Sequence, residues 1–322
     1  MDYKRRITQR ELAQAAGVDV STVSLALNNH PRIPAPTRER ILKLAVRLGY
    51  KPDPALASLA AHRWQGRRDY QGLTLALAVD ARDREEMEWR LYAAGVRERA
   101  AAIGYGVSEF QLTDYPSPRR FWEVIRQRGI RGVIFIQARR RFESEWMEAA
   151  VAPSVHCGFL HPVEADVVMP NLDAAVRLAW QMVAESGMRI AFFLPVEAEL
   201  YSDQILLGTA LTVCRSRARA VSARIFGDKP DSIERLKQWR PQRVIVINEK
   251  NSVQLRRAEL PSACAIYPLH LLDADKKRSG VDLQMEKVGA AAVDFLELKI
   301  RRYPLGLYHS RQTLMIDPVW VR

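Results

Sequence analysis

Residues 7–59 determine the fold of the N-terminal part of the chain and read ITQRELAQAAGVDVSTVSLALNNHPRIPAPTRERILKLAVRLGYKPDPALASL. Thr8 and Glu11 form a capping box, in which the hydroxyl and the carboxylate each accept a hydrogen bond from a free backbone N–H. The spacing therefore predicts a helix that begins after Thr8 and ends at Gly17, the first residue able to leave the helical conformation easily.

Two further helices are predicted in the same stretch. Asp19 can cap a second helix over residues 20–28, and a third helix is expected over about residues 35–48, closed by Gly49. Two helices joined by a tight glycine-containing turn, with a third closing a small core, are typical of a helix-turn-helix DNA-binding unit. A three-helix bundle that binds no DNA is the alternative. The side chains expected to face the core are Leu12, Ala15, Ala16, Val23, Ala26, Leu27, Ile41, Leu44, Ala45 and Leu48.

Charge is concentrated in this segment. The chain of 322 residues has a formal net charge of +12, and residues 1–70 contain 13 Lys and Arg against 6 Asp and Glu. A basic module on a nearly balanced body suggests a polyanion as its partner. The alternative is a basic face that only contacts water.

The segment after the third helix is predicted to form a short helix and a linker. Asp53 can cap residues 54–61, which give two turns of helix at most, and a helix this short needs a partner surface to be stable. Residues 62–69 have the polar composition of a linker.

The rest of the chain alternates short apolar runs with amphipathic stretches, and this order predicts βαβ units with parallel sheets. About 250 residues of this pattern suggest two such sheets. Strands are expected at residues 73–79, 132–137, 154–159, 189–195, 243–248 and 263–268, and helices at 86–102, 119–128, 172–185, 203–215, 232–240 and 285–302.

Composition and motifs exclude several classes. With 48% hydrophobic and 27% charged residues the chain is neither disordered nor fibrous, and no apolar run approaches the length of a membrane span. Cys157, Cys214 and Cys264 lack metal-binding spacing and are expected to be reduced. His156, Cys157 and His161 are the only tight group of metal-ligand types, and strand alternation should point the first two to opposite faces. No phosphate-loop, dinucleotide, metalloprotease or hydrolase motif is present, so neither an enzyme, a metal site nor a cofactor is expected.

The order A-x-x-A-G-V-x-x-x-T-V-S-x-x-L-N, followed by T-R-E-R-I, L-G-Y-x-P and S-L, resembles the N-terminal module of the LacI/GalR (lactose-repressor) family of bacterial regulators. The resemblance is strong over residues 7–59 and looser in the body, where NLDAAVRLA from Asn171 and SGVDLQMEKVGAAAVDFL from Ser279 are most similar. It implies a helix-turn-helix domain followed by an α/β body of two doubly wound parallel-sheet subdomains, like a periplasmic binding protein.

The resemblance also implies roles for residues of the first module. Val20, Ser21 and Leu25 would read base edges in the major groove, and Leu25 offers only apolar contact, for instance with a thymine methyl group. Leu59 in the hinge helix would be a minor-groove wedge. The expected contacts to the DNA backbone are Thr8, Thr22, Ser24, Asn28, Arg32, Thr37 and Tyr50.

Each of these roles has a structural alternative. The alternative for Thr8 and Thr37 is that they cap helices without contacting DNA. Tyr50 could complete the small core, and Leu59 could belong to an amphipathic linker. Pro34 stands where relatives usually have a capping Ser or Thr, so one hydroxyl is expected to be lost.

In the body, the resemblance implies an effector site between the subdomains, and the sequence departs from it. Ile205 and His270 stand where relatives have Arg and Asp, which argues against a typical polyhydroxylated sugar. Trp89, Glu249 and His270 are the expected effector residues. The alternatives are a core position for Trp89, a helix-start acid for Glu249 and a solvated loop position for His270.

The sequence thus predicts a homodimeric transcriptional regulator, a repressor that binds a palindromic double-stranded DNA operator under control of a small-molecule effector. It is expected in the cytoplasm, associated with the nucleoid when bound to its operator, and not at a membrane. The rivals are a small-molecule-binding protein or an α/β enzyme whose helical module does not bind DNA. The expected boundaries are 1–51 for the DNA-binding domain, 52–70 for hinge helix and linker, and 71–322 for the body, with 71–171 plus 279–305 in one subdomain and 172–278 plus 306–322 in the other.

Overall fold

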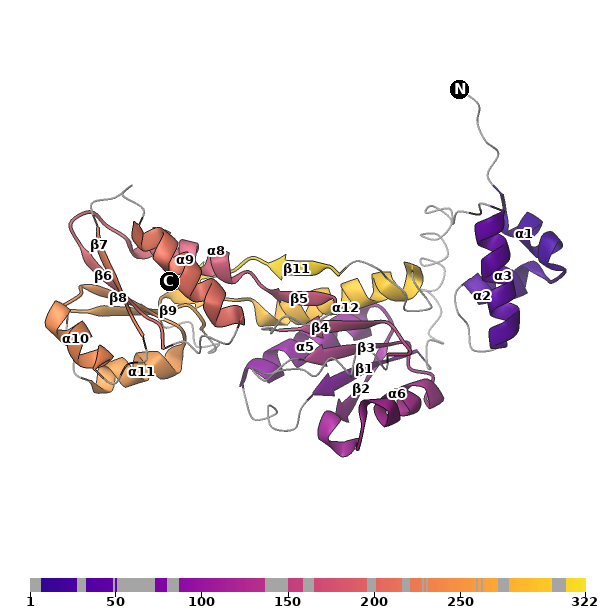
Figure 1. The fold of residues 1–322 in the computed structure, drawn as a ribbon, viewed down its shortest axis with the longest axis horizontal. Helices are drawn as coiled ribbons and strands as arrows, with labels where there is room; N and C mark the ends of the chain where they lie inside the picture. The colour runs from indigo at the N-terminus through magenta and orange to yellow at the C-terminus, as the bar shows by residue number, and fades with distance from the viewer. Residues whose placement is uncertain are drawn as a thin grey trace, which may run out of the picture.

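A computed structural model describes residues 7–27, 33–48, 50, 73–79, 87–136, 150–158, 165–195, 201–215, 221–227, 229, 231–258, 260–261, 263–271, 278–302 and 311–322. Its N-terminal part is helical, and its body is built on parallel sheets (Figure 1). The expected fold class is confirmed. The helices of the first part are α1 (Gln9–Ala16), α2 (Val20–Leu27) and α3 (Ala35–Arg47).

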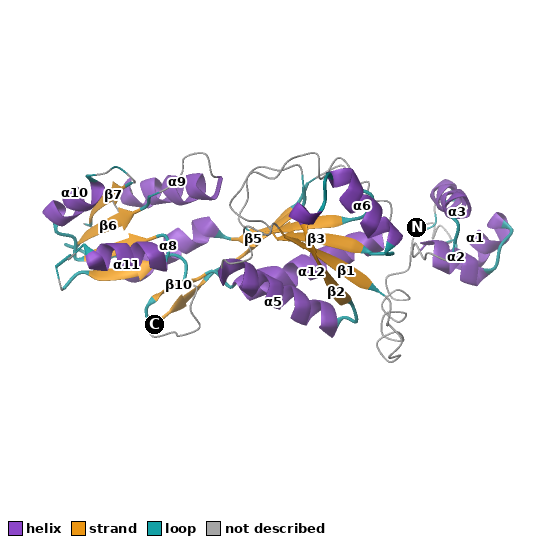
Figure 2. Cartoon of the chain, turned by 90° about the horizontal axis from the view of Figure 1, so that it is seen from below, coloured by secondary structure: helices purple, strands orange, loops and turns teal. Residues whose placement is uncertain are grey.

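The first subdomain of the body contains a six-stranded sheet in the order β11-β5-β4-β3-β1-β2, and every neighbouring pair is parallel. Helices α5 and α12 pack on this sheet, and α6 joins the core on its other side (Figure 2). The elements are β1 (Thr74–Val79), α5 (Met87–Ala102), β2 (Gly106–Gln111), the short 3-10 helix η2 (Leu112–Asp114), α6 (Pro118–Gln127), β3 (Gly132–Ile136), β4 (Ser154–Cys157), β5 (Val167–Pro170), α12 (Met285–Arg302) and β11 (Thr313–Ile316).

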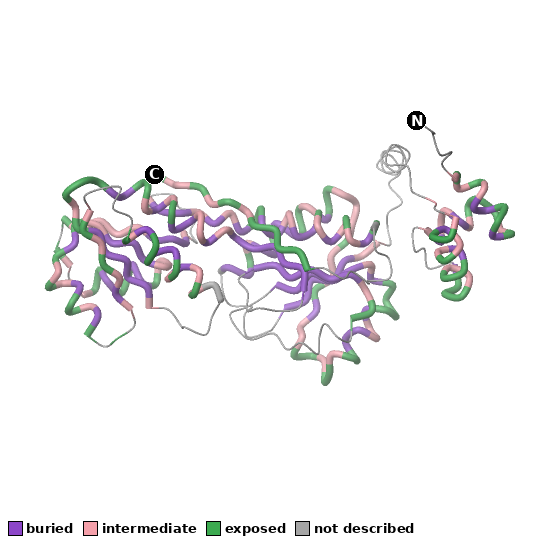
Figure 3. The backbone as a smooth tube through the Cα atoms, turned by 45° about the horizontal axis from the view of Figure 1, so that its top comes forward, coloured by how far each residue is buried: buried purple, intermediate pink, exposed green. Residues whose placement is uncertain are grey.

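The second subdomain contains a four-stranded parallel sheet in the order β7-β6-β8-β9 and a two-stranded antiparallel sheet of β10 and β12. The strands at the centre of both parallel sheets are buried on both faces, as Figure 3 shows in purple. The elements are α8 (Leu172–Val183), β6 (Arg189–Phe193), α9 (Tyr201–Arg215), β7 (Ser222–Phe226), α10 (Ser232–Trp239), β8 (Arg243–Val246), α11 (Glu249–Arg257), β9 (Ala265–Pro268), β10 (Gly280–Asp282) and β12 (Val319–Val321).

The C-terminal segment differs from the expected division of the body. Residues 306–322 are expected in the second subdomain, but β11 pairs in parallel with β5 in the first sheet, and only β12 joins the second subdomain. Conversely, β10 lies in the stretch expected in the first subdomain and pairs with β12. Exposed side chains such as Leu314 and Met315 give β11 no buried-strand pattern, so local sequence carries no signal for its pairing.

A close contact between two glycines and two backbones joins α5 to α12. A Cβ added at Gly95 would lie 1.8 Å from the Glu286 carbonyl oxygen, and one added at Gly289 would lie 2.2 Å from the Tyr92 carbonyl oxygen. The two helices therefore touch through their backbones, and only glycine permits this separation.

The buried face of α12 also holds an ion pair. Lys299 Nζ contacts Asp166 and donates to the Ser154 carbonyl at 3.0 Å, while Asp166 Oδ1 accepts from the Gln312 N–H at 2.8 Å. These contacts connect α12 to the starts of β4, β5 and β11.

The two neighbouring residues His156 and Cys157 point to opposite faces of the first sheet, as strand alternation predicts. Cys157 lies in the core beneath α5 and α12, whereas the His156 ring stacks on Phe135 at 5.0 Å. Burial, with the charge of Lys299 as a smaller cause, lowers the pKa of His156 to about 3.

We expect Gly95→Ala to lower the free energy of unfolding by about 3 kcal/mol, because the added methyl meets backbone that cannot move aside. Gly208→Ala is the matched control, since Gly208 lies in a helix with no atom within 4 Å of the added Cβ, and there alanine should stabilise by about 0.5–1 kcal/mol. Urea midpoints of the two variants measure the difference. An unchanged midpoint for Gly95→Ala would contradict the close packing.

The buried His156 predicts a loss of stability in acid. The unfolded chain binds a proton at His156 below about pH 6.5, whereas the folded chain binds it only near pH 3. Stability is therefore lost as the pH falls from 6.5 towards 3, by about 2 kcal/mol at pH 5. In His156→Gln, the drop in urea midpoint between pH 7 and pH 5 should be smaller than in the unaltered chain. An equal drop in both proteins would show that His156 contributes nothing to it.

Candidate nucleic-acid interface and effector site

The first helix of the N-terminal part begins with the predicted capping box. The Glu11 N–H donates to Thr8 Oγ1 at 3.2 Å, and the Thr8 N–H donates to Glu11 Oε2 at 2.8 Å. The Thr8 hydroxyl itself donates to Glu11 Oε2 at 3.0 Å, so Thr8 has a structural role whether or not it also meets DNA.

The turn between α1 and α2 needs a glycine. Gly17 has φ of 65°, a left-handed conformation that glycine adopts without strain, and its N–H returns to the Ala13 and Gln14 carbonyls. The chain then turns into α2, where the Val23 N–H donates to the Asp19 carbonyl at 3.1 Å. No side-chain bond of Asp19 at this helix start is established.

The three helices enclose one small core. Ala13 is buried and Ala15 is exposed, so the predicted position of Ala15 in the core is wrong. Which alanine of α1 faces the core depends on how α1 packs on the other two helices. The short apolar pattern of α1 does not determine this packing. The buried core residues are Leu12, Ala13, Ala16, Val23, Ala26, Ile33, Ile41 and Ala45, with Leu27, Leu44, Leu48 and Tyr50 packed against them.

The outer face of α2 carries the three candidate base readers. Val20 is 39% exposed and Ser21 is exposed, while Leu25 is half-buried and packs against the small core. A half-buried leucine can still present its methyl groups to a partner, but its position is fixed by the core behind it.

The candidate backbone contacts are partly described. Thr22, Ser24 and Thr37 are half-buried at the surface, and Tyr50 packs against the small core, as its structural alternative required. Pro34 occupies the position before α3 and gives no side-chain hydrogen bond, which confirms the expected loss of a hydroxyl. Asn28, Arg32 and Leu59 lie outside the described residues.

The surface of this domain is basic where it is exposed. The exposed cationic side chains of α1 and α3 are Arg10, Arg40, Lys43 and Arg47. Exposed cations on the same small domain as α2 are of the kind that binds a phosphate backbone.

One of the three predicted effector residues, His270, contacts the residue that precedes another of them, Trp89, in the chain. His270 follows β9 of the second subdomain, and its Nδ1 is 3.4 Å from Oε1 of Glu88 on α5 of the first subdomain. Trp89 is the neighbour of Glu88 and is 8% exposed, and within the described part of the chain its indole N–H has no hydrogen-bond partner. His270 is buried, so the alternative of a solvated loop position does not apply to it.

Glu249 lies apart from this pair in the contacts that the structure gives. It begins α11 and forms an ion pair with Arg278, which precedes β10. Its neighbour Asn248 caps α11 by accepting from the Asn251 N–H at 3.2 Å. The structural alternative, an acid in the first turn of a helix, therefore applies to Glu249.

Sequence reasoning missed Glu88 and Met285. Glu88 is buried beside His270, and Met285 Sδ is 3.4 Å from His270 Nε2. A carboxylate in the first turn of an amphipathic helix is usually solvated, so only its position one residue before Trp89 could have indicated Glu88. In the described part of the chain, no group of three or more His, Cys, Asp or Glu side chains could hold a metal ion, and no helix there combines the length and apolarity needed to cross a membrane.

Comparisons with known proteins relate this chain to bacterial transcriptional regulators. Residues 8–53 match the family model described as bacterial regulatory proteins, lacI family. The HTH-type transcriptional regulator DegA of Bacillus subtilis is 28% identical over 132 residues, which cover 40% of this chain and 36% of that protein. The uncharacterized HTH-type transcriptional regulator YkvZ of the same organism is 23% identical, over 92% of this chain and 94% of its own.

Solved structures share the fold. The transcriptional regulator CelR–cellobiose complex has a TM-score of 0.56 at 18% identity, covering 98% of this chain and 99% of its own. The lac repressor dimer bound to operator and the anti-inducer ONPF has a TM-score of 0.56 at 15% identity, covering 99% and 98%.

The helical domain and its relatives together define a DNA-binding transcriptional regulator of the helix-turn-helix class, not an enzyme. Its N-terminal domain, residues 8–53, is the part that matches the model of the lacI family of bacterial regulatory proteins.

Proposed function

We propose that the protein is a repressor that binds a palindromic operator as a homodimer and responds to a small molecule bound between its two subdomains. The observation that carries the proposal is an exposed α2 in a basic three-helix domain joined to a two-subdomain body. The similar lac repressor structure is a dimer bound to operator, and the CelR structure is a complex with cellobiose. The proposed place of action is the cytoplasm, at the nucleoid when the operator is bound.

The proposed division of labour follows the chain. Residues 1–51 bind DNA, residues 52–70 form the hinge helix and linker, and residues 71–322 bind the effector and dimerise. A two-fold axis between two copies of α2 requires a palindromic site.

Within the DNA-binding domain, Val20, Ser21 and Leu25 are the proposed base readers. Valine and leucine have no hydrogen-bonding group, so only Ser21 can distinguish bases by donating or accepting, and the two apolar side chains favour thymine methyl groups. The proposed backbone contacts are Thr8, Thr22, Ser24, Asn28, Arg32, Thr37 and Tyr50, and Leu59 is the proposed wedge that opens a base step in the minor groove.

The proposed effector site includes Trp89, His270 and Glu249; the contact of His270 with Glu88, the chain neighbour of Trp89, supports the first two. The Trp89 N–H is a buried donor without a partner among the described residues, which a ligand oxygen could satisfy. Ile205 and His270 stand where relatives have Arg and Asp, and this loss of a guanidinium donor and a carboxylate acceptor favours a ligand other than a polyhydroxylated sugar.

In vitro selection and salt titration of the full chain test the DNA-binding proposal. We expect selection to enrich a palindrome, and affinity for it to fall by about a thousandfold or more between 50 and 200 mM salt, because several phosphates are contacted per dimer. Leu59→Ala should lose specific binding and keep nonspecific binding, whereas Leu298→Ala, at an exposed leucine of α12, should change neither. Absence of an enriched palindrome would disprove the proposal, and equal loss of both kinds of binding in Leu59→Ala would disprove the wedge.

A thermal-shift screen of the full chain against sugars, nucleobases, amino acids and carboxylic acids tests the effector site. A compound that stabilises the protein should bind about tenfold more weakly to Trp89→Phe, which keeps a smaller aromatic ring and removes the N–H donor. Trp239→Phe is the matched control, because Trp239 packs on Phe226 in the second subdomain far from α5 in the chain. Equal binding by all three proteins would exclude Trp89 from the site.

A further inference from the structure

The chain passes between the two subdomains three times, at three short segments. The first crossover is Asn171, between β5 and α8; the second is residues 283–284, between β10 and α12; and the third is residues 317–318, between β11 and β12. Any change in the relative orientation of the subdomains must be absorbed in these few residues, because regular strands and helices lie on both sides.

The three crossovers are joined to one another by hydrogen bonds that meet at Asp317. Asn171 Nδ2 donates to Asp317 Oδ1 at 2.8 Å, which connects the first crossover to the third. Gln284 Nε2 donates to the Asp317 carbonyl at 2.6 Å, which connects the second crossover to the third. We name Asn171, Gln284 and Asp317 the crossover node.

Backbone contacts support the crossover node. The Asn171 N–H donates to the Ile316 carbonyl at 2.8 Å, and the Gln284 N–H donates to Asp282 Oδ1 at 2.7 Å. Asn171 Oδ1 also accepts from the Ala174 N–H at 3.1 Å. The amide oxygen of Asn171 therefore caps α8, and its nitrogen donates to Asp317.

Gln284 has an unusual backbone. Its φ is 54°, in the left-handed region that disfavours every residue with a Cβ. The bonds from its N–H and its side chain keep the residue in this conformation. A residue in this strained conformation persists only where its surroundings hold it, and such residues cluster at functional and switch segments; here one of the holding bonds comes from the third crossover.

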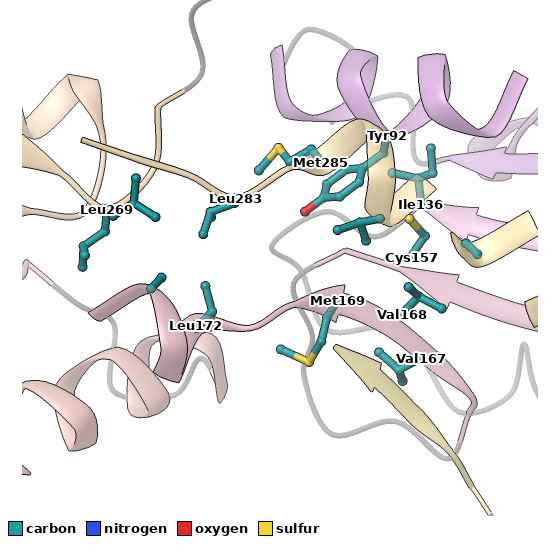
Figure 4. Close-up of a cluster of buried hydrophobic side chains, with 14 of the residues drawn as sticks. Tyr92, Ile136, Cys157, Val167, Val168, Met169, Leu172, Leu269, Leu283 and Met285 are labelled. Atoms are coloured by element: carbon teal, nitrogen blue, oxygen red, sulfur yellow. The ribbon is translucent and has the colours of Figure 1, made fainter. Parts of the chain in front are cut away.

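The two sides of the crossovers differ in character. Towards the core, Leu172 and Leu283 point toward one another, with Met169, Met285 and Leu269 around them (Figure 4). Towards solvent lies the crossover node, where Asp317 is exposed. Apolar contacts are non-directional and permit small sliding, whereas hydrogen bonds specify one geometry. The node is therefore the part that selects an orientation.

We propose that Asn171, Gln284 and Asp317 are positioning residues that set the resting orientation of the two subdomains, and through it the DNA affinity of the chain. The second half of this statement rests on the proposed function. Because the node is exposed to water, each of its bonds has a modest net strength, and loss of one should shift the equilibrium between orientations by about fivefold.

An exchange of partners tests the proposal. In Asn171→Asp the oxygen that caps α8 is retained, while the donor to Asp317 is lost and two carboxylates face one another. Adding Asp317→Asn restores a bond with donor and acceptor reversed. Glu123→Gln, which removes an exposed ion pair of α6 away from all crossovers, is the matched control.

Hydrogen exchange of the full chain is the primary measurement. We expect amides of residues 167–173 and 313–319 to exchange about fivefold faster in Asn171→Asp, with β3 and β6 unchanged, and to return to the original rate in the double variant. Unchanged exchange in Asn171→Asp, equal acceleration throughout the chain, or a double variant as fast as the single one would overturn the proposal.

Affinity for the selected operator is the second measurement. It should differ at least about threefold between the unaltered chain and Asn171→Asp, and return in the double variant. Equal operator affinity in all variants would overturn the link to DNA binding. A failure of the proposed function would look different, because the unaltered chain would then bind no specific operator while the exchange experiment would still give its result.

Discussion

The backbone contact between α5 and α12 is the constraint on which the rest of the body depends. Gly95 and Gly289 lack side chains where each meets a carbonyl oxygen of the other helix, so the two helices cannot shift without breaking this contact. Glu88 and Trp89 lie near the start of α5, and α12 begins directly after Gln284. The same contact therefore fixes the start of α5, which carries the candidate effector residue Trp89, relative to the second crossover.

His270 is buried against the starts of α5 and α12. His270 belongs to the second subdomain, yet it touches Glu88 of α5 and Met285 at the start of α12. Three elements from both subdomains thus meet at one imidazole. A buried carboxylate beside an imidazole is stable only while both remain together, because either group alone would lose its compensation for burial. A change in the orientation of the subdomains would therefore also change the burial of Glu88.

Sequence predicted those parts of the structure that depend on neighbours along the chain. The capping box at Thr8, the glycine turn at Gly17 and the fully apolar strands such as β3 follow from local hydrogen bonding and periodicity, and they were found. The strands β2 and β7 were missed because each lies at a sheet edge and mixes polar with apolar residues, and the short strands β5, β10, β11 and β12 were missed as well. β11 was assigned to the wrong side of the body because its partner β5 is more than 140 residues away.

The candidate site divides in the same way. Trp89 and His270 were selected from a resemblance, whereas Glu88, which precedes Trp89 and contacts His270, was invisible to any local pattern. The crossover node was equally hidden, because Asn171 and Asp317 are distant in sequence and each has an ordinary local reading: one as a helix cap, the other as a turn residue. Asn171 shows why such residues escape notice. Its capping oxygen satisfies every local expectation, so nothing in the sequence signals that its nitrogen binds another segment. Dual use of one amide means that the α8 cap and the link between subdomains form together, and a change in subdomain orientation must act on the first turn of α8.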